Sequence, residues 1–321
     1  MRKLYDQMLE NIKNSKEITD DAKRGLMSDL LKASENKANI LITGATGCGK
    51  SSTINALFGI EKAEVGTGAD PQTMSITKYD YNGLTLWDSP GLGDGPEADK
   101  RHAEGIIKKI TERDDDGNLL IDVVLVILDG SSRDLGTSFE LIEKVIAPCI
   151  GKNDKRLLVA INQADIAMKG KHWDAENHRP DETLQNFLKE KERSVHERIL
   201  NGCGISVDPI SYSAGYKEEG QPQEPSYNLA KLLYYIIDSI PEEKRVATYL
   251  EANADQQVWA SNDSNDYAEK IQKKLGWKHT LKSTSEGAMI GAAIGSLIPV
   301  IGTTVGAAVG GLVGFIGSFF D

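Results

Sequence analysis

Residues 44–51 have the sequence GATGCGKS and fit the pattern GxxxxGK[ST] of a glycine-rich loop that holds phosphate groups. An apolar run at 38–43 predicts a buried strand before the loop, and residues 52–58 predict the start of a helix after it. Glycines let successive N–H groups turn toward a phosphate, and a helix N-terminus adds partial positive charge. The pattern therefore predicts that Lys50 contacts the β- and γ-phosphates of a nucleotide and that Ser51 ligates Mg²⁺. The predicted contacts from this loop are Gly44, Thr46, Gly47, Cys48, Gly49, Lys50, Ser51 and Ser52.

A second motif, DSPG at 88–91, follows the next clear apolar strand and lies 38 residues after Lys50. In this position we expect Asp88 to hold Mg²⁺ through a water and the Gly91 N–H to meet the γ-phosphate. Between the two motifs, a polar loop at 70–76 leads into a strand and offers Thr73 as a further ligand of Mg²⁺ and the γ-phosphate. Thr67 and Thr77 are rivals for that role, and an ordinary loop threonine is the alternative.

The tetrad NQAD at 162–165 ends another apolar strand and predicts the choice of base. The Asp165 carboxylate can accept from both N1–H and the 2-amino group of guanine, whereas adenine offers no such pair of donors. Asn162 is predicted to contact the same base. Further along, SYSAG at 211–215 follows a short apolar run, and we expect the Ala214 N–H to meet guanine O6 while Ser213 braces the turn.

The elements around these motifs predict an α/β fold. Apolar runs at 38–43, 84–87, 121–128, 156–161 and 209–212 alternate with segments of helical periodicity, such as 139–150 and 184–200. Continuous Val/Ile/Leu runs between helices are typical of a mainly parallel sheet covered on both faces, the three-layer arrangement of P-loop NTPases. Ligands then bind at the carboxyl ends of the strands, where the motifs above fall.

Outside this region the composition changes. Residues 1–36 predict two amphipathic helices, 37–245 the nucleotide-binding domain, 246–286 a polar helical connector and 287–321 a glycine-rich apolar tail. The net charge of −11 argues against general nucleic-acid binding. Three sparse cysteines predict free thiols in a reducing compartment, and the N-terminal residues lack the apolar core of a signal peptide. We therefore expect a cytoplasmic protein, free or attached to a membrane through its tail.

Segment 287–320 contains nine glycines and no charged residue, with glycines at four-residue steps that bring helix backbones close together. Residues 300–320 are long enough to span a bilayer, whereas 287–298 are too short. A helical hairpin with its turn near Pro299, inserted in a membrane or packed on the nucleotide-binding domain, is the alternative arrangement. The cost of so much glycine in a soluble helix favours contact with a membrane.

Taken together, GATGCGKSSTINALFG, WDSPGLGDG and NQAD resemble the translation-factor-related class of P-loop GTPases. The resemblance covers about 37–245 and is to the Era-like, 50S-ribosome-binding GTPases, with septin-like and immunity-associated GTPases as relatives. It implies GTP or GDP and Mg²⁺ as ligands, hydrolysis assisted by Lys50, Thr73 and Gly91, and homo-oligomers when GTP is bound.

The chain departs from the family pattern at three positions. Gln163 replaces the lysine that usually lies along the base, Leu92 replaces the water-orienting Gln of Ras-like members, and Gly47 replaces a potassium-binding Asn. We therefore expect hydrolysis that is slow or stimulated by a partner or by self-association. Arg133 either donates charge to a neighbour's phosphate or is a solvated loop residue. An ATPase with Asp129 as its metal residue is a further alternative, but it leaves NQAD unexplained.

Three functions follow from this interpretation. The first is a GTPase switch whose nucleotide state controls the tail and its contact with a membrane or partner. The second is a soluble, ribosome-associated GTPase. The third is a weakly hydrolysing scaffold that assembles through its glycine zipper.

Overall fold

The computed structural model describes residues 3–59, 75–151, 154–216, 225–281 and 296–302. A six-stranded sheet in the order β2-β3-β1-β4-β5-β8 forms its centre, and only β2 runs antiparallel to its neighbour. The strands of this sheet are β1 (Ala38–Gly44), β2 (Thr77–Asp80), β3 (Leu84–Asp88), β4 (Val123–Asp129), β5 (Leu157–Asn162) and β8 (Ile210–Ser211). A separate small hairpin pairs β6 (Trp173–Asp174) with β7 (Arg179–Pro180). The mainly parallel α/β architecture is thus confirmed.

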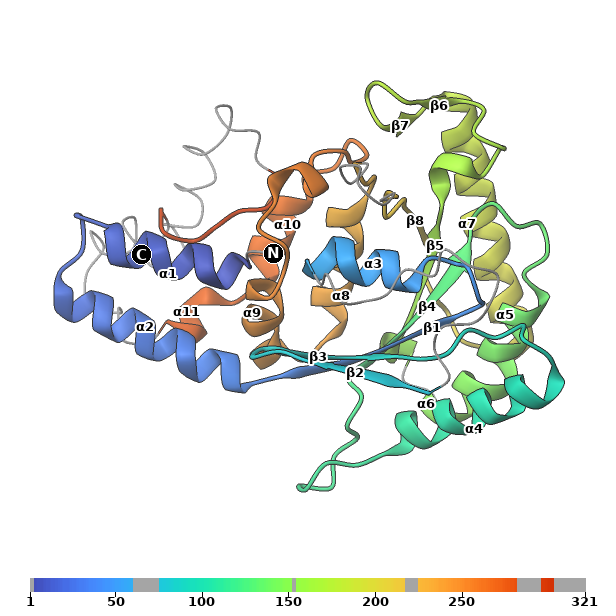
Figure 1. The fold of residues 1–321 in the computed structure, drawn as a ribbon, viewed down its shortest axis with the longest axis horizontal. Helices are drawn as coiled ribbons and strands as arrows, with labels where there is room; N and C mark the ends of the chain where they lie inside the picture. Colours follow the sequence, from blue (N-terminus) through green and yellow to red (C-terminus); the bar gives the residue numbers. More distant parts are fainter. Residues whose placement is uncertain (1–2, 60–74, 152–153, 217–224, 282–295, 303–321) are drawn as a thin grey trace.

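Both faces of the sheet are apolar because each strand sends alternate side chains to opposite sides. In β4, Val123, Leu125 and Ile127 belong to one buried cluster, and the residues between them belong to the other. The first cluster includes α3 (Lys50–Phe58) and α8 (Leu229–Ser239), and the second includes α4 (Pro96–Thr111) and α7 (Glu182–Cys203). Two helical layers therefore enclose the sheet (Figure 1).

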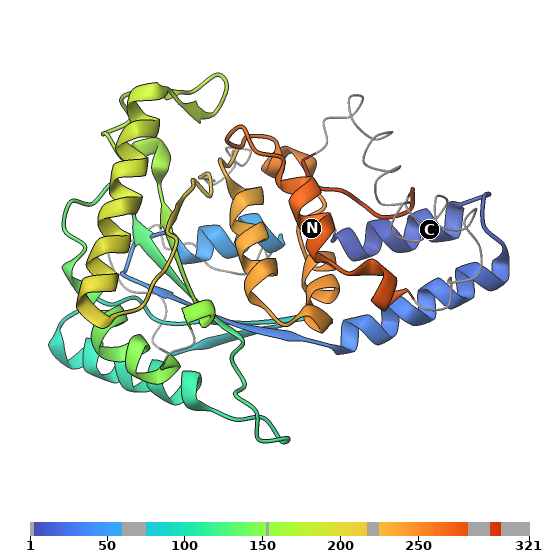
Figure 2. The same cartoon turned by 180° about the vertical axis from the view of Figure 1, so that it is seen from behind.

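N-terminal and C-terminal helices gather at one end of the molecule in both ribbon views (Figures 1 and 2). This helical lobe consists of α1 (Leu4–Asn14), α2 (Asp20–Glu35), α9 (Glu242–Leu250), α10 (Tyr267–Lys274) and α11 (Trp277–Thr280). Its apolar side chains belong to the same buried cluster as α3 and α8. The boundary that the sequence places at residue 245 falls inside α9, so the lobe and the sheet share one core.

The remaining helical segments are short: α5 (Gly136–Glu140), a π-helical turn (Leu141–Ile146), α6 (Ala147–Ile150), and 3₁₀ turns at Asp154–Arg156, Ala164–Ile166 and Gln256–Trp259. The sequence predicts one regular helix over 139–150, but the structure has a π-helical turn there. Pro148 lacks an N–H and its ring crowds the carbonyl group four residues earlier, which accounts for the wider turn.

Most of the glycine-rich tail lies outside the described residues. The part that the structure describes, 296–302, is a non-helical segment whose Leu297, Ile298 and Ile301 are buried in the core with the helical lobe. Within the described residues, no helix is long and apolar enough to cross a membrane.

Candidate functional site

The phosphate loop connects β1 to α3, as the sequence predicts. Gly47 and Gly49 have φ angles of 79° and 89°, in the left-handed region that favours glycine. A Cβ at Gly44 would lie 2.2 Å from the Ile127 carbonyl oxygen, so the neighbouring strand also requires a glycine there. The N–H groups of Gly47, Gly49 and Ser51 donate to no other described residue. They are therefore free to bind an anion at the N-terminus of α3.

The Lys50 side chain folds back over this loop, where its Nζ lies 3.2 Å from the Gly44 carbonyl oxygen and 3.1 Å from that of Ala45. The ammonium group is thus held beside the free N–H groups, as phosphate binding requires. Cys48 is fully buried behind the loop, and burial raises the pKa of its thiol. The thiol therefore stays protonated at neutral pH and adds no negative charge beside a phosphate.

The DSPG segment packs directly against the phosphate loop. The Thr46 N–H donates to the Leu92 carbonyl at 3.0 Å, and the Leu92 N–H donates to the Gly44 carbonyl at 3.4 Å. A Cβ at Gly91 would lie 2.6 Å from the Thr46 Cα, so only glycine fits between the two segments. The structure therefore places Gly91 beside the phosphate loop, and the contact of its N–H with a γ-phosphate stays a prediction.

Asp88 ends β3 next to the end of β1 and is 2% exposed. Its Oδ1 is buried and has no hydrogen-bond partner among the described residues. Burial raises the pKa of Asp88 to about 6, and the Lys50 charge partly offsets this shift. A buried carboxylate oxygen without a partner, facing the charge of Lys50, fits the position of a ligand to Mg²⁺ or to its bound water.

The raised pKa of Asp88 makes a prediction for the apo protein. Because the native state keeps this proton up to about pH 6, stability falls as pH rises from about 4 through 6. We expect Asp88→Asn to be more stable than wild type at pH 7 by about 2–3 kcal/mol, and by much less at pH 4. Urea unfolding at several pH values, in EDTA and without nucleotide, measures this difference. A difference that is constant with pH would contradict the assignment.

Asn162 joins the phosphate loop to the segment that is predicted to bind the base. Its Nδ2 donates to the Cys48 carbonyl at 3.0 Å, and its Oδ1 accepts from the Ala214 N–H at 3.0 Å. The next residue, Gln163, has a left-handed φ of 61° and donates from Nε2 to the Gly47 carbonyl at 3.1 Å. The N–H of Ala214 that was expected to meet guanine O6 is therefore directed at Asn162.

Removing the Asn162 side chain would leave two buried backbone groups without partners. We expect Asn162→Ala to lower the free energy of unfolding by about 2–3 kcal/mol, because each unsatisfied buried group costs about 1–3 kcal/mol. Gln163→Ala is the matched control, since its bond is exposed, and it should lower stability by no more than about 1 kcal/mol. Equal effects of the two substitutions in chemical denaturation would show that Asn162 does not join the segments.

The other predicted base-binding residues lie near Asn162. Asp165 belongs to the 3₁₀ turn Ala164–Ile166, is partly exposed, and forms no hydrogen bond with another described residue. Ser213 pairs with Tyr227 through the backbone, and its Oγ accepts from the Gly215 N–H at 3.3 Å. The phosphate loop and both base-binding segments therefore meet at the carboxyl ends of the parallel strands.

Some candidates lie apart from these strand ends or outside the description. Thr73 and Thr67 lie outside the described residues, and Thr77 is the first residue of β2. Asp129 Oδ1 accepts from the Ser131 N–H at 2.8 Å and the Ser132 N–H at 3.2 Å. This oxygen is thus bonded within its own loop, which disfavours the ATPase alternative. Arg133, in the same loop, is exposed.

Two contributions were not predicted from the sequence. The hydroxyl of the buried Tyr212 lies 2.6 Å from Thr53 Oγ1 and joins the base-binding segment to α3. His102 Nδ1 lies 3.0 Å from the Gly91 carbonyl oxygen and holds the DSPG segment from α4. Tyr212 lies inside the SYSAG motif, but the motif does not indicate a partner for its hydroxyl, and no motif marks His102, because each contact depends on the packing of distant segments.

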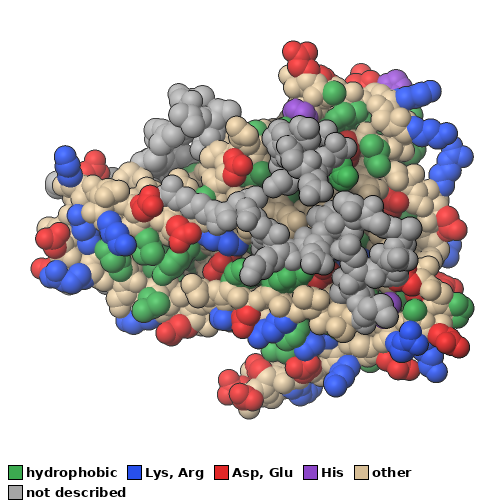
Figure 3. All heavy atoms as spheres, in the orientation of Figure 1, with side chains coloured by type: hydrophobic (Ala, Val, Ile, Leu, Met, Phe, Trp, Pro, Cys, Tyr) green, Lys and Arg blue, Asp and Glu red, His purple; other side chains and the backbone are tan. Residues whose placement is uncertain are grey.

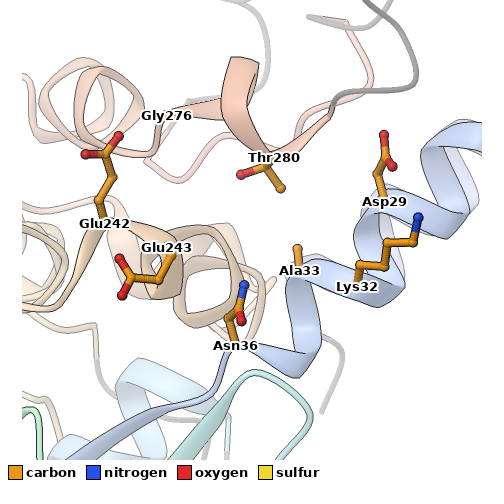
Figure 4. Close-up of a pocket in the computed structure, with 8 residues that line it drawn as sticks. All are labelled: Asp29, Lys32, Ala33, Asn36, Glu242, Glu243, Gly276 and Thr280. Carbon is orange, nitrogen blue, oxygen red and sulfur yellow. The ribbon is translucent and has the colours of Figure 1, made fainter.

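A hollow of about 590 Å³ lies elsewhere, between α2, α9 and α11 (Figure 4). Its lining includes the carboxylates of Asp29, Glu242 and Glu243 against the single cation Lys32. Phosphate groups would be repelled there. The nucleotide-binding candidate therefore remains the group of strand ends at the phosphate loop.

This fold and this site define a P-loop nucleotide-binding protein. Residues 39–163 match the family model described as 50S ribosome-binding GTPase. Curated relatives include mouse T-cell-specific guanine nucleotide triphosphate-binding protein 2, 46% identical over 61 residues, which are 17% of this chain and 15% of the relative. Mouse interferon-inducible GTPase 1 is 35% identical over 105 residues, which are 29% of this chain and 24% of the relative. The chain thus matches no more than a quarter of the length of these relatives.

Among solved structures, the chain is similar to a probable GTP-binding protein EngB, with a TM-score of 0.40 and 19% identity over 63% of this chain and 98% of that chain. It is also similar to Toc33 from Arabidopsis thaliana, with a TM-score of 0.44 and 16% identity over 75% of this chain and 93% of that chain.

Proposed function

We propose that this protein binds GTP with Mg²⁺ at the phosphate loop and hydrolyses it to GDP and phosphate. The observation that carries this proposal is the meeting of three parts at the carboxyl ends of the parallel strands: the free N–H groups of the loop, the buried Asp88, and the segment 162–165 bonded to the loop through Asn162. Lys50 and the loop N–H groups bind the phosphates, and Asp165 selects guanine. Ser51, Asp88 and Thr73 are the proposed ligands of Mg²⁺, which neutralises phosphate charge when bound.

Hydrolysis is proposed to be slow without a partner. Leu92, directly after Gly91, is apolar and buried, so it offers no group to orient an attacking water. Catalysis then rests on Lys50, Thr73 and the Gly91 N–H, until a partner or a second copy adds a further group. Phosphate release measured at increasing protein concentration, with GTP in excess, tests this proposal. A rate per molecule that rises with concentration supports self-association, and a high constant rate contradicts slow intrinsic turnover.

We further propose that nucleotide state is coupled to the tail through the helical lobe. α3, which begins at Lys50, ends against the lobe: the Asn253 N–H donates to the Leu57 carbonyl at 2.9 Å, and Lys3 Nζ donates to the Phe58 carbonyl. The same lobe holds segment 296–302, because Tyr249 donates from its hydroxyl to the Pro299 carbonyl at 2.7 Å. Asn11 Nδ2 donates to the Leu297 carbonyl at 2.9 Å. A shift of α3 would therefore move the helical lobe and, through it, the contacts that hold segment 296–302.

We propose that this shift releases the tail, which then contacts a membrane or a partner. The protein itself is proposed to be cytoplasmic. We expect sedimentation with phospholipid vesicles to be greater with a nonhydrolysable GTP analogue than with GDP, and to disappear when residues 287–321 are deleted. Tyr249→Phe, which loses the bond to Pro299, should increase sedimentation with GDP. Equal sedimentation of the full chain in both nucleotide states would contradict the coupling.

Two alternatives remain for this site. A scaffold that scarcely hydrolyses GTP would bind guanine nucleotides but release no phosphate, with or without vesicles. A soluble ribosome-associated GTPase would bind ribosomal particles and would not sediment with vesicles. On the face drawn in Figure 3, acidic and basic side chains of the described residues are interspersed, and with the net charge of −11 this disfavours RNA as the main partner.

A further inference from the structure

The loop after β4, residues 129–132, packs directly against the segment that is predicted to bind the base. In the sheet, Asp129 at the end of β4 is the register partner of Asn162 at the end of β5. The Gly130 N–H donates to the Asn162 carbonyl at 2.8 Å. A Cβ at Gly130 would lie 2.3 Å from that carbonyl oxygen and 3.3 Å from the Gln163 carbonyl oxygen, so this close approach requires a glycine. The position of loop 129–132 therefore affects the position of the NQAD segment.

A second contact joins the same loop to a side chain of NQAD. Ser131 Oγ lies 3.4 Å from Gln163 Oε1, and Gln163 Nε2 donates to the Gly47 carbonyl at 3.1 Å. The Gln163 amide thus contacts loop 129–132 through its oxygen and the phosphate loop through its nitrogen. Asp165 lies two residues further along, in the turn that begins after Gln163. A displacement of loop 129–132 would therefore disturb the support of the turn that carries Asp165.

Lys191 holds this loop from α7. Its ammonium group donates to the Ser132 carbonyl at 2.8 Å and also to the Gly130 carbonyl. The side chain is partly buried, and burial lowers the pKa of Lys191, although the charge of Asp129 partly offsets this shift. Hydrogen bonds from a charged donor are stronger than those between neutral groups. One ammonium group therefore fixes two carbonyl groups of the loop that supports NQAD.

We propose that Lys191 is a positioning residue for the recognition of guanine. It fixes loop 129–132, and the loop fixes the backbone of Asn162 and the side chain of Gln163. These two residues place the Asp165 carboxylate against N1–H and the 2-amino group of the base. The proposal rests on the proposed function, because it concerns how the same site selects its nucleotide.

Competition of GDP and inosine diphosphate against a fluorescent nucleotide, with Mg²⁺ present, tests this role. Hypoxanthine keeps N1–H but lacks the 2-amino group, so the wild type should prefer GDP by at least about ten-fold. Lys191→Met removes the ammonium donors and keeps an apolar stem of similar length. A displaced Asp165 weakens two bonds to GDP but only one to inosine diphosphate. We therefore expect Lys191→Met to lower the ratio of the two affinities by at least about five-fold.

Three further variants locate the effect. Lys191→Arg keeps a cation that can donate to both carbonyl groups, so it should restore most of the preference for GDP. Gly130→Ala disturbs the same contact from the other side, since its Cβ would meet the Asn162 carbonyl, and it should lower the ratio as Lys191→Met does. Lys189→Met, at an exposed lysine of α7, makes the same chemical change away from the loop and should keep the wild-type ratio.

Affinities are compared below the melting temperature of each variant, so that only folded protein contributes. An equal loss of affinity for both nucleotides in Lys191→Met would indicate general loosening of the site and overturn the positioning role. If the wild type discriminates and Lys191→Met discriminates equally, the proposed function stands and only this proposal is overturned. A wild type that binds both nucleotides equally, or neither, would overturn base recognition by Asp165 and this proposal with it.

Discussion

Lys50→Ala is expected to weaken GTP and GDP binding by about 100-fold or more while the fold is kept. The ammonium group is the one positive side chain of the phosphate loop, and charge-assisted bonds to phosphate are among the strongest hydrogen bonds in proteins. Among the described residues it is bonded only to the loop carbonyls of Gly44 and Ala45, so its removal leaves the core untouched. Titration with fluorescent GDP measures the affinity, and circular dichroism checks the fold.

The matched control is Lys108→Ala, which removes one exposed lysine from α4 and changes the net charge equally. It should bind nucleotide as the wild type does. If Lys50→Ala kept its affinity, the loop at 44–51 would not be the phosphate site, whatever the fold of the chain.

Asp165→Asn is expected to change the preferred base from guanine to xanthine. The carboxylate accepts from N1–H and the 2-amino group of guanine, whereas an asparagine can donate to the 2-oxo group of xanthine. A polar group left unpaired against the wrong base discriminates strongly, so we expect the ratio of GDP to XDP affinity to fall by at least about 100-fold. Competition of GDP and XDP against a fluorescent nucleotide measures the ratio directly.

Asp154→Asn, an exposed residue of the 3₁₀ turn before β5, makes the same chemical change away from the base and should keep the wild-type preference. An unchanged ratio in Asp165→Asn would place base recognition elsewhere in the chain.

The parallel strands of the sheet were predictable from sequence because they are almost wholly buried, unlike the edge strand β2. In a parallel sheet both faces are covered, so β1, β4 and β5 appear as continuous Val, Ile and Leu runs, and the predicted limits agree with the observed ones within two residues. The phosphate loop was predictable for a different reason. Glycine is favoured at Gly47 and Gly49 by their left-handed backbone conformation and required at Gly44 by the nearby Ile127 carbonyl oxygen, and these constraints produce a recognisable sequence pattern.

The contacts that assemble the site were not predictable from local pattern. Asn162 was expected to contact the base, but its partners in the structure are Cys48 and Ala214, which are 114 and 52 residues away. Gln163, which was seen only as a missing lysine, bonds to Gly47. The shared core of α1, α2 and α9 was hidden too, because amphipathic helices indicate a buried face and not the surface that covers it.

The central claim is that this site binds guanine nucleotides and hydrolyses GTP, and one measurement tests it most directly. Purified protein with Mg²⁺ is titrated with fluorescent GTP, GDP and ATP, and phosphate release from GTP is then followed with and without liposomes. The account predicts guanine-selective binding, slow release of phosphate by the protein alone and faster release of phosphate when liposomes are present. Preference for ATP, or affinity for none of the three nucleotides, would contradict it.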